Sequence, residues 1–222
     1  MPGMYVVFVC GGIASGKSAV ARRMGKLGAT RLDLDQVARD VVRPHGPVLA
    51  QIAEAFGDDL IDPETGELDR HGLAERAFAT PEDTARLERI EHPAIRSELA
   101  SRLDALRSAS YPTRLAVVEV PLLDRALDLL PLADEVVAVV CPIDLRRERA
   151  VGRGMDADDF DRRVALQPSD AFVREHADTV IENDEGPYEL EGKVDKWYER
   201  RMRKGWRPDP ASRARGEGGE RA

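Results

Sequence analysis

The chain has 222 residues, of which 42% are hydrophobic, enough for one domain with insertions or for two small domains. Its formal net charge of −8 argues against general binding to nucleic acid or to anionic membranes, so a polyanionic ligand needs a local basic cluster. The sequence has no apolar run of about 18 residues and no cleavable leader pattern, so we expect a cytoplasmic protein with no membrane contact.

The first predicted element is a strand from Met4 to Cys10, a continuous β-branched and aromatic run typical of a strand buried on both faces of a parallel sheet. A glycine-rich stretch follows it, and helical spacing then runs from Ala19 to Leu27. This order of strand, loop and helix is the context that the pattern G-x-x-x-x-G-K-[ST] requires.

The glycine-rich stretch is predicted to bind the phosphates of a nucleotide. Without side chains at its glycines the backbone can curl so that N–H groups point inward, at the positive end of the next helix. Lys17 would reach the β- and γ-phosphates, and the Ser18 hydroxyl would ligate Mg²⁺. The alternative is a turn that merely closes a βα unit. The predicted site comprises Gly11, Gly12, Ile13, Ala14, Ser15, Gly16, Lys17 and Ser18.

A second short strand is predicted from Thr30 to Leu34, followed by a helix over Gln36 to Val42. Asp33 would face the phosphate loop from this strand end, where its carboxylate can accept a proton from an acceptor hydroxyl. Asp35 is expected to cap the helix, and capping is also the alternative for Asp33.

A largely helical block is predicted from Val48 to about Arg107, inserted between strands as a substrate-binding subdomain would be. Pro81 is expected at the first position of one helix. The pair His92-Pro93 is expected to separate that helix from the next.

The remaining predicted strands are Leu115 to Val120, Glu135 to Cys141 and Thr179 to Asn183. A charged helical stretch precedes the last strand and a helix from Tyr188 to about Arg203 follows it. The composition from residue 207 to residue 222 predicts a disordered tail.

Strands that alternate with helices predict an α/β fold with a five-stranded parallel sheet. The carboxyl ends of such strands share one rim, where ligands bind. Glu119 ends an apolar strand there, as the acid that holds magnesium through a water does in other nucleotide-binding proteins. A plain strand-end charge is the alternative. Cys10 and Cys141 also end strands, and we expect both to be buried free thiols.

Four arginines lie at helical spacing early in the charged stretch, and they suit a lid that covers the site and presents guanidinium groups to the phosphoryl group in transfer. Arg149 and Arg153 are four residues apart and share a helix face. The alternative is a solvated helix face. The four residues are Arg146, Arg147, Arg149 and Arg153.

Over residues 4 to 200 the chain resembles the dephospho-CoA kinase family of P-loop kinases. The resemblance rests on an ordered set of motifs rather than on the phosphate loop alone. They are GGIASGKS from Gly11 to Ser18, the D-x-D at Asp33, His92-Pro93 with Ile95, Val120-Pro121-Leu122-Leu123, Arg149 and Arg153, Gln167, Ala177-Asp178, and Ile181-Glu182-Asn183.

The resemblance implies ATP-dependent phosphorylation of the ribose 3'-hydroxyl of dephospho-CoA, with Mg²⁺. We also expect the protein to be a monomer. The resemblance makes Asp33 and Lys17 catalytic, gives Arg149 contact with the transferred phosphate, and adds Asn183 to the nucleotide site. It also implies three parts. They are a nucleotide core of residues 1–35, 108–145 and 177–206, a CoA-binding insertion of residues 36–107, and a lid of residues 146–176.

The chain departs from the family pattern at several positions. Ala14 stands where glycine is usual, although alanine should permit the turn, and Arg146 stands where glutamine is frequent. Two rival functions are a kinase for another small acceptor of the nucleoside, gluconate or shikimate type, and a GTP switch or nucleotide-sensing regulator. The N-K-x-D motif of a GTP switch does not follow the fourth predicted strand, where the chain continues as Cys141-Pro142-Ile143-Asp144.

Overall fold

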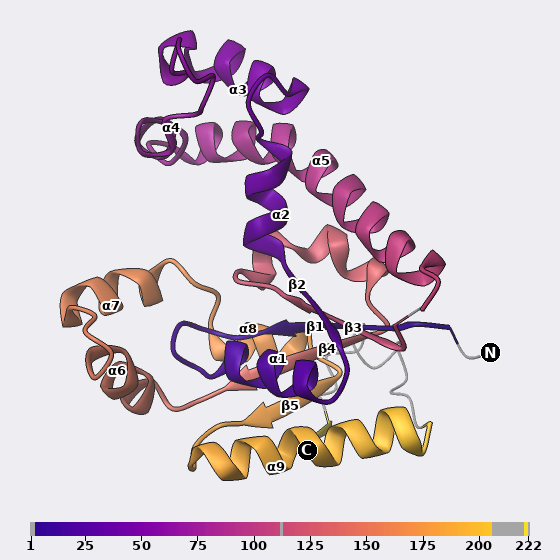
Figure 1. Ribbon diagram of the computed structural model, residues 1–222. Coiled ribbons are helices and arrows are strands. Elements are labelled where there is room, and N and C mark those ends of the chain that lie inside the picture. The colour runs from indigo at the N-terminus through magenta and orange to yellow at the C-terminus, as the bar shows by residue number, and fades with distance from the viewer. Residues whose placement is uncertain (1–2, 112, 206–219, 222) are drawn as a thin grey trace. The chain divides into compact units, whose positions relative to one another are not determined.

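The computed structural model describes residues 3–111, 113–205 and 220–221. The chain forms two compact units, and a parallel β-sheet is the centre of one of them. This unit comprises residues 1–33 and 106–222, and the other is the helical segment 34–105 (Figure 1). All strands are parallel, in the order β2-β3-β1-β4-β5-β6. The strands are β1 (Tyr5–Cys10), β2 (Thr30–Asp33), β3 (Leu115–Glu119), β4 (Glu135–Val140), β5 (Thr179–Glu182) and β6 (Glu220–Arg221).

The five predicted strands are confirmed, each within one residue of its expected bounds. The short β6 adds to them at the edge of the sheet, where Glu220 is in register with Thr179. The predicted disordered tail, 207–222, lies outside the described residues except for β6.

Helices α1 (Lys17–Lys26) and α9 (Pro187–Tyr198) cover one face of the sheet (Figure 1). The strands read as continuous apolar runs because β1 and β4 are buried on both faces. The core between the sheet and these helices includes Val7, Val9, Met24 and Trp197.

A buried ion pair anchors the end of α9, which continues as a π-helical turn, η4 (Glu199–Arg203). The Glu135 carboxylate accepts from Arg201 Nε at 2.9 Å and from Trp197 Nε1 at 2.9 Å. Both charged residues are almost fully buried. Because a buried charge needs its partner, this pair fixes the register of the last helix against β4.

Three short helices occupy the charged stretch that was predicted to be helical, α6 (Ile143–Val151), α7 (Ala157–Ala165) and α8 (Asp170–Glu175). Side-chain caps begin two of them. Asp156 accepts from two backbone N–H groups of α7, and Ser169 accepts from one of α8. The 3₁₀ helices η2 (Leu123–Arg125) and η3 (Leu127–Leu132) lie between β3 and β4 in the chain.

The helical unit has its own core, which includes Leu49, Ile52, Leu60 and Leu73. None of the described helices, in either unit, is long and apolar enough to cross a membrane. The unit contains α2 (Leu34–Val41), α3 (Pro47–Phe56), η1 (Asp58–Leu60), α4 (Arg70–Ala77) and α5 (Pro81–Ser108) as far as Ala105.

The expected helix break at His92-Pro93 is wrong. Helix α5 begins at Pro81, as predicted, but it runs without interruption to Ser108 with Pro93 inside it. A proline inside a helix removes one hydrogen bond and costs about 3 kcal/mol. The buried side chains of Ile95, Leu99 and Leu103 continue beyond it at helical spacing, and their packing outweighs the local cost.

Candidate active site

A loop with three positive backbone angles joins β1 to α1. The φ angles are 148° at Gly11, 58° at Ala14 and 104° at Gly16. The Ser15 N–H donates to the Gly12 carbonyl at 3.1 Å, which closes a turn inside the loop. The predicted order of strand, loop and helix is therefore confirmed. Ala14 adopts the left-handed conformation, which costs a residue with a Cβ about 1–2 kcal/mol.

The glycines of this loop are required by close neighbours as well as by backbone angle. A Cβ at Gly11 would lie 2.3 Å from the Val139 carbonyl oxygen, and one at Gly16 would lie 2.2 Å from Asn183 Nδ2. The first neighbour is backbone and cannot move aside. A side chain at either position would push the loop away from the strand ends that support it.

Side chains from distant parts of the sequence hold the loop backbone. Gln167 Oε1 accepts from the Ile13 N–H at 2.8 Å, and Arg146 Nε donates to the Ile13 carbonyl at 2.8 Å. Asn183 Nδ2 donates to the Ser15 carbonyl at 2.7 Å. The N–H and the carbonyl of Ile13 are thus both hydrogen-bonded to side chains outside the loop. These contacts with the segment between β4 and α9 hold the loop in its curved conformation.

Arg146 differs from the expectation that the four arginines belong to a charged lid that presents guanidinium groups to the phosphoryl group. Its side chain is only 6% exposed and also lies 3.3 Å from Asp170 Oδ1. Arg147 is exposed and pairs with Asp161 at 3.2 Å. Arg146 precedes the buried Ala150 by four residues, and this helical spacing is the sequence signal that places it on the inward face.

Arg149 lies at the carboxyl ends of β4 and β5. Its Nη1 donates to the Asn183 carbonyl at 3.2 Å, and its Nη2 donates to the Glu185 carbonyl at 3.0 Å. The sulfur of Cys141 lies 3.3 Å from Nη1. Asn183 therefore touches both the loop and Arg149, through its side chain and its backbone respectively.

Two of the predicted acidic residues are neighbours at the same rim. Asp33 and Glu119 end adjacent strands in register, and Glu119 is also in register with Val9 of β1, two residues before the loop. The Glu119 carboxylate accepts from Arg31 Nη2 at 2.6 Å. Helix α2 begins at Leu34, so Asp35 lies in its first turn rather than at its cap.

Both cysteines are free and buried, as expected. Burial raises the pKa of the Cys10 thiol to about 12, while the positive charge of Lys17 acts in the opposite direction. The charge of Lys17 therefore reaches the end of β1. A thiol with so high a pKa stays protonated at neutral pH and is not a nucleophile.

The part of the chain that the structure describes contains no group of three or more His, Cys, Asp or Glu side chains that would hold a metal by themselves. Ser18 is exposed in the first turn of α1. Mg²⁺ usually binds through few protein ligands, with phosphate oxygens and waters filling the rest of its shell. A serine hydroxyl at a helix N-terminus, beside a glycine cradle, fits this form of binding.

The family-profile match and the similar sequences agree on one family. A family profile described as dephospho-CoA kinase matches residues 5–189. A dephospho-CoA kinase of Corynebacterium efficiens is 43% identical over 188 residues, 84% of this chain and 91% of that protein. The structure of TT1252 from Thermus thermophilus has a TM-score of 0.76 at 26% identity and covers 90% of this chain and 99% of its own. Dephospho-CoA kinase from Campylobacter jejuni shares the fold, with a TM-score of 0.66 at 24% identity, over 90% of this chain and 98% of its own.

Proposed function

The chain belongs to the dephospho-CoA kinase family, and on this basis we propose that it transfers the γ-phosphoryl group of ATP to the ribose 3'-hydroxyl of dephospho-CoA. The products are coenzyme A and ADP, and the reaction completes coenzyme A biosynthesis. The observation that carries the proposal is the braced loop at the end of β1, which shares a sheet rim with Asp33. The family match does not favour the rival acceptors or a nucleotide-sensing role.

The loop from Gly11 to Ser18 would hold the triphosphate of ATP. Its helix N-terminus offers N–H groups that lack partners within the helix, together with the positive end of the helix dipole. Lys17 would add a point charge at the β- and γ-phosphates. Arg146, Gln167 and Asn183 support this role because they fix the loop before any nucleotide binds, which lowers the entropic cost of binding.

The Ser18 hydroxyl would ligate Mg²⁺, and Glu119 would hold one of its waters. When bound, the ion would neutralise part of the phosphate charge and so favour phosphoryl transfer. The Glu119 carboxylate can serve in this way through Oε2, because only its Oε1 accepts from Arg31 among the described residues. Arg31 also keeps the Glu119 carboxylate in place at the rim.

Asp33 would accept the proton of the ribose 3'-hydroxyl as that oxygen attacks the γ-phosphorus. It is exposed at the end of β2, next to Glu119 in the sheet register, so its carboxylate lies at the rim that holds the loop. A hydroxyl is a poor nucleophile until its proton can leave. A carboxylate near the attacking oxygen meets that need without covalent chemistry.

Arg149 would meet the phosphoryl group in transfer. Its guanidinium now donates to two carbonyls at the ends of β4 and β5 and would exchange these bonds for phosphate oxygens as the lid closes. Asn183 would act on the nucleotide mainly by holding Ser15. We also propose that the enzyme is a cytoplasmic monomer.

A coupled assay of nucleoside diphosphate release, ADP from ATP or GDP from GTP, tests the reaction across a panel of acceptors. The panel contains dephospho-CoA, adenosine, gluconate and shikimate, each with ATP or GTP as donor. We expect release only with ATP and far more with dephospho-CoA than with the small acceptors. Faster release with gluconate or shikimate than with dephospho-CoA would refute the proposed function. A thermal-shift measurement in which GTP alone stabilises the protein would also refute it.

A further inference from the structure

The loop between β5 and α9, residues 183–186, touches the phosphate loop. Its first residue, Asn183, is buried, and its side chain donates to the Ser15 carbonyl at 2.7 Å. The Asn183 N–H donates to the Val140 carbonyl at 2.7 Å, which ties the start of the loop to β4. A Cβ added to Gly16 would lie 2.2 Å from Asn183 Nδ2. A shift of this loop, or a charge placed on it, is therefore felt at the phosphate loop.

The next two residues of this loop are acidic. Asp184 and Glu185 follow Asn183 directly, and their side chains are about half exposed. Carboxylates close to a triphosphate repel it, and the repulsion extends over about 10 Å at ordinary ionic strength. In a chain with a net charge of −8 they add to a field that already disfavours a polyanion. A nucleotide site beside this loop thus needs a cation that offsets the two acids.

Lys193 of α9 is placed to be that cation. Its Nζ donates to the Glu182 carbonyl at 2.8 Å. The same atom lies 3.3 Å from Asp184 Oδ1 and 3.4 Å from Glu185 Oε1. An ammonium group has three N–H donors, and these three acceptors can use all of them. One side chain therefore joins the end of β5 to both acids of the loop.

The position of Lys193 on α9 keeps its ammonium group at this loop. Leu190, three residues before it, and Trp197, four residues after it, are buried, so Lys193 shares their side of the helix. Its side chain is 20% exposed, which fits an apolar stem that lies along the core and ends in a charged head. The pKa of Asp184 is held below its usual value by its own backbone N–H and by the hydrogen bond from Lys193. Asp184 is therefore ionised at neutral pH.

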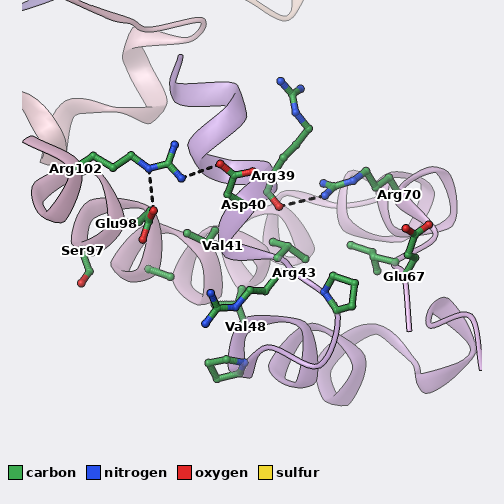
Figure 2. A pocket seen from close by; sticks show the side chains of 15 residues that line it. Arg39, Asp40, Val41, Arg43, Val48, Glu67, Arg70, Ser97, Glu98 and Arg102 are labelled. Atoms are coloured by element: carbon green, nitrogen blue, oxygen red, sulfur yellow. Dashed lines mark hydrogen bonds and ion pairs between the residues drawn. The ribbon is translucent and has the colours of Figure 1, made fainter. Parts of the chain in front are cut away.

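A cluster of similar composition in the helical unit shows a purely structural arrangement. Arg102, which lines a cavity of that unit, donates to Asp40 Oδ2 at 2.7 Å and to Glu98 Oε1 at 2.8 Å (Figure 2). Its two acids lie on α2 and α5, so the cluster joins one helix to another. Lys193 differs, because both of its acids lie in the loop that carries Asn183 to the phosphate loop.

We propose that Lys193 is a positioning residue for ATP, which neutralises Asp184 and Glu185 so that their loop can lie against the phosphate loop without repelling the triphosphate. The inference rests on the proposed function, because ATP is the ligand concerned. Arg149 brings a second cation to the same loop, through the carbonyls of Asn183 and Glu185. When Arg149 turns to the phosphoryl group, Lys193 stays as the cation that offsets the two acids.

The test compares Lys193→Met with Lys196→Met at an ionic strength of about 0.01 M. Methionine keeps most of the lysine stem and removes the charge. Lys196 is an exposed lysine of the same helix, so each substitution removes one positive charge from the chain. Lys193→Met should raise the KM for ATP about three- to tenfold, with kcat and the KM for dephospho-CoA unchanged. Lys196→Met should match wild type, and equal effects of the two substitutions would overturn the proposal.

Neutral replacements of the two acids separate charge from packing. Asp184→Asn with Glu185→Gln removes both carboxylates, and the triple variant adds Lys193→Met. The KM for ATP should then follow the charge of the loop. It should be highest for Lys193→Met, lower for wild type, lower again for the triple variant and lowest for the double variant. At about 0.5 M KCl these differences should shrink to within about twofold, because salt screens them.

Two outcomes of this series would overturn the proposal. A KM for ATP that stays raised in the triple variant, shown to be folded by urea denaturation, would mean that Lys193 acts through packing alone. A double variant whose KM for ATP equals or exceeds that of wild type would exclude repulsion by the acids. The double variant keeps Lys193, so this result is decisive even if Lys193→Met does not fold.

Isothermal titration with ATP in the absence of acceptor gives a readout that does not depend on catalysis. The affinities should follow the same order as the KM values. A wild type that does not bind ATP would refute the proposed function. Equal affinities for ATP in wild type, Lys193→Met and the double variant at low ionic strength would overturn the role of Lys193 and leave the kinase function intact.

Discussion

Replacement of Arg146 by methionine tests whether the buried arginine holds the phosphate loop. Methionine keeps most of the side-chain volume but removes every donor. The substitution deletes one short charge-assisted hydrogen bond, 2.8 Å from Nε to the Ile13 carbonyl, and two contacts of 3.3 and 3.4 Å to Asp170 and Gln167. A hydrogen bond to a charged group contributes about 1.5–3 kcal/mol, and the two long contacts contribute little.

We therefore expect Arg146→Met to lower the free energy of unfolding by about 2 kcal/mol. The carboxylate of Asp170 adds little to this cost, because its side chain is 39% exposed and water replaces its partner. The KM for ATP should rise about tenfold, because the loop would be less ordered in the free enzyme and its ordering would reduce the binding free energy of ATP. Urea denaturation and steady-state kinetics measure the two effects.

Arg147→Met is the matched control from the next position of the same helix. Arg147 pairs with Asp161 at 3.2 Å, but both side chains are about half exposed, so the pair is worth about 0–1 kcal/mol. The control should keep both its stability and its KM for ATP. Equal effects of the two substitutions would refute the reasoning, because the account depends on the burial of Arg146 and on its bond to Ile13.

Three further predictions concern single side chains. Asp33→Asn should lower kcat by at least about 100-fold with little change in the KM for dephospho-CoA, because it removes proton acceptance rather than binding; a raised KM at normal kcat would make Asp33 a binding residue. Ala14→Gly should raise the free energy of unfolding, measured with urea, by about 0.5 kcal/mol. Glycine removes the cost of a Cβ at the positive φ, while its greater flexibility in the unfolded chain offsets part of that gain. A loss of stability would contradict that account of the loop. Burial raises the pKa of Glu91 to about 7, so the folded state binds an extra proton between about pH 4.5 and 7 and stability from this group is lost as the pH rises. Glu91→Gln should therefore stabilise the protein by about 2 kcal/mol in urea at pH 8 and leave it unchanged at pH 4, and an equal gain at both values would exclude titration as the cause.

The sheet and its rim follow from local sequence patterns. The apolar runs ending at Cys10 and Glu119 are long, continuous and rich in β-branched residues, so their strands and their order with the glycine loop are predictable. Parallel pairing also predicts that Asp33 and Glu119 share one rim, and this relation depends on period and direction alone. That the two residues are direct neighbours depends on the strand order, which was not predicted.

Features that depend on tertiary packing were harder to predict. Pro93 has a strong local preference to end a helix, and only the buried leucines beyond it carry α5 onward. The inward turn of Arg146 depends on an acceptor, the Ile13 carbonyl, more than 130 residues away in the chain, which no local pattern contains. The pairing of Glu135 with Arg201 likewise joins two residues that appear in the sequence as ordinary surface charges.

A match to a family motif specifies the role of some residues more fully than that of others. Gln167 and Asn183 belong to the motif set by which the chain resembles its family, and both contact the backbone of the phosphate loop. Their geometry gives them a supporting role that the motif alone did not specify. Arg149 contacts two carbonyls and the sulfur of Cys141, so its part in phosphoryl transfer stays a prediction.

The most direct test of the account is identification of the product formed from dephospho-CoA and ATP. Mass spectrometry and ³¹P NMR of the reaction mixture should show one added phosphoryl group, located on the ribose 3'-oxygen, in an amount equal to the ADP released. The Lys17→Ala variant should form none. Release of ADP with dephospho-CoA left unmodified would contradict the central claim, because it would show a nucleotide hydrolase whose rim does not direct the phosphoryl group to an acceptor.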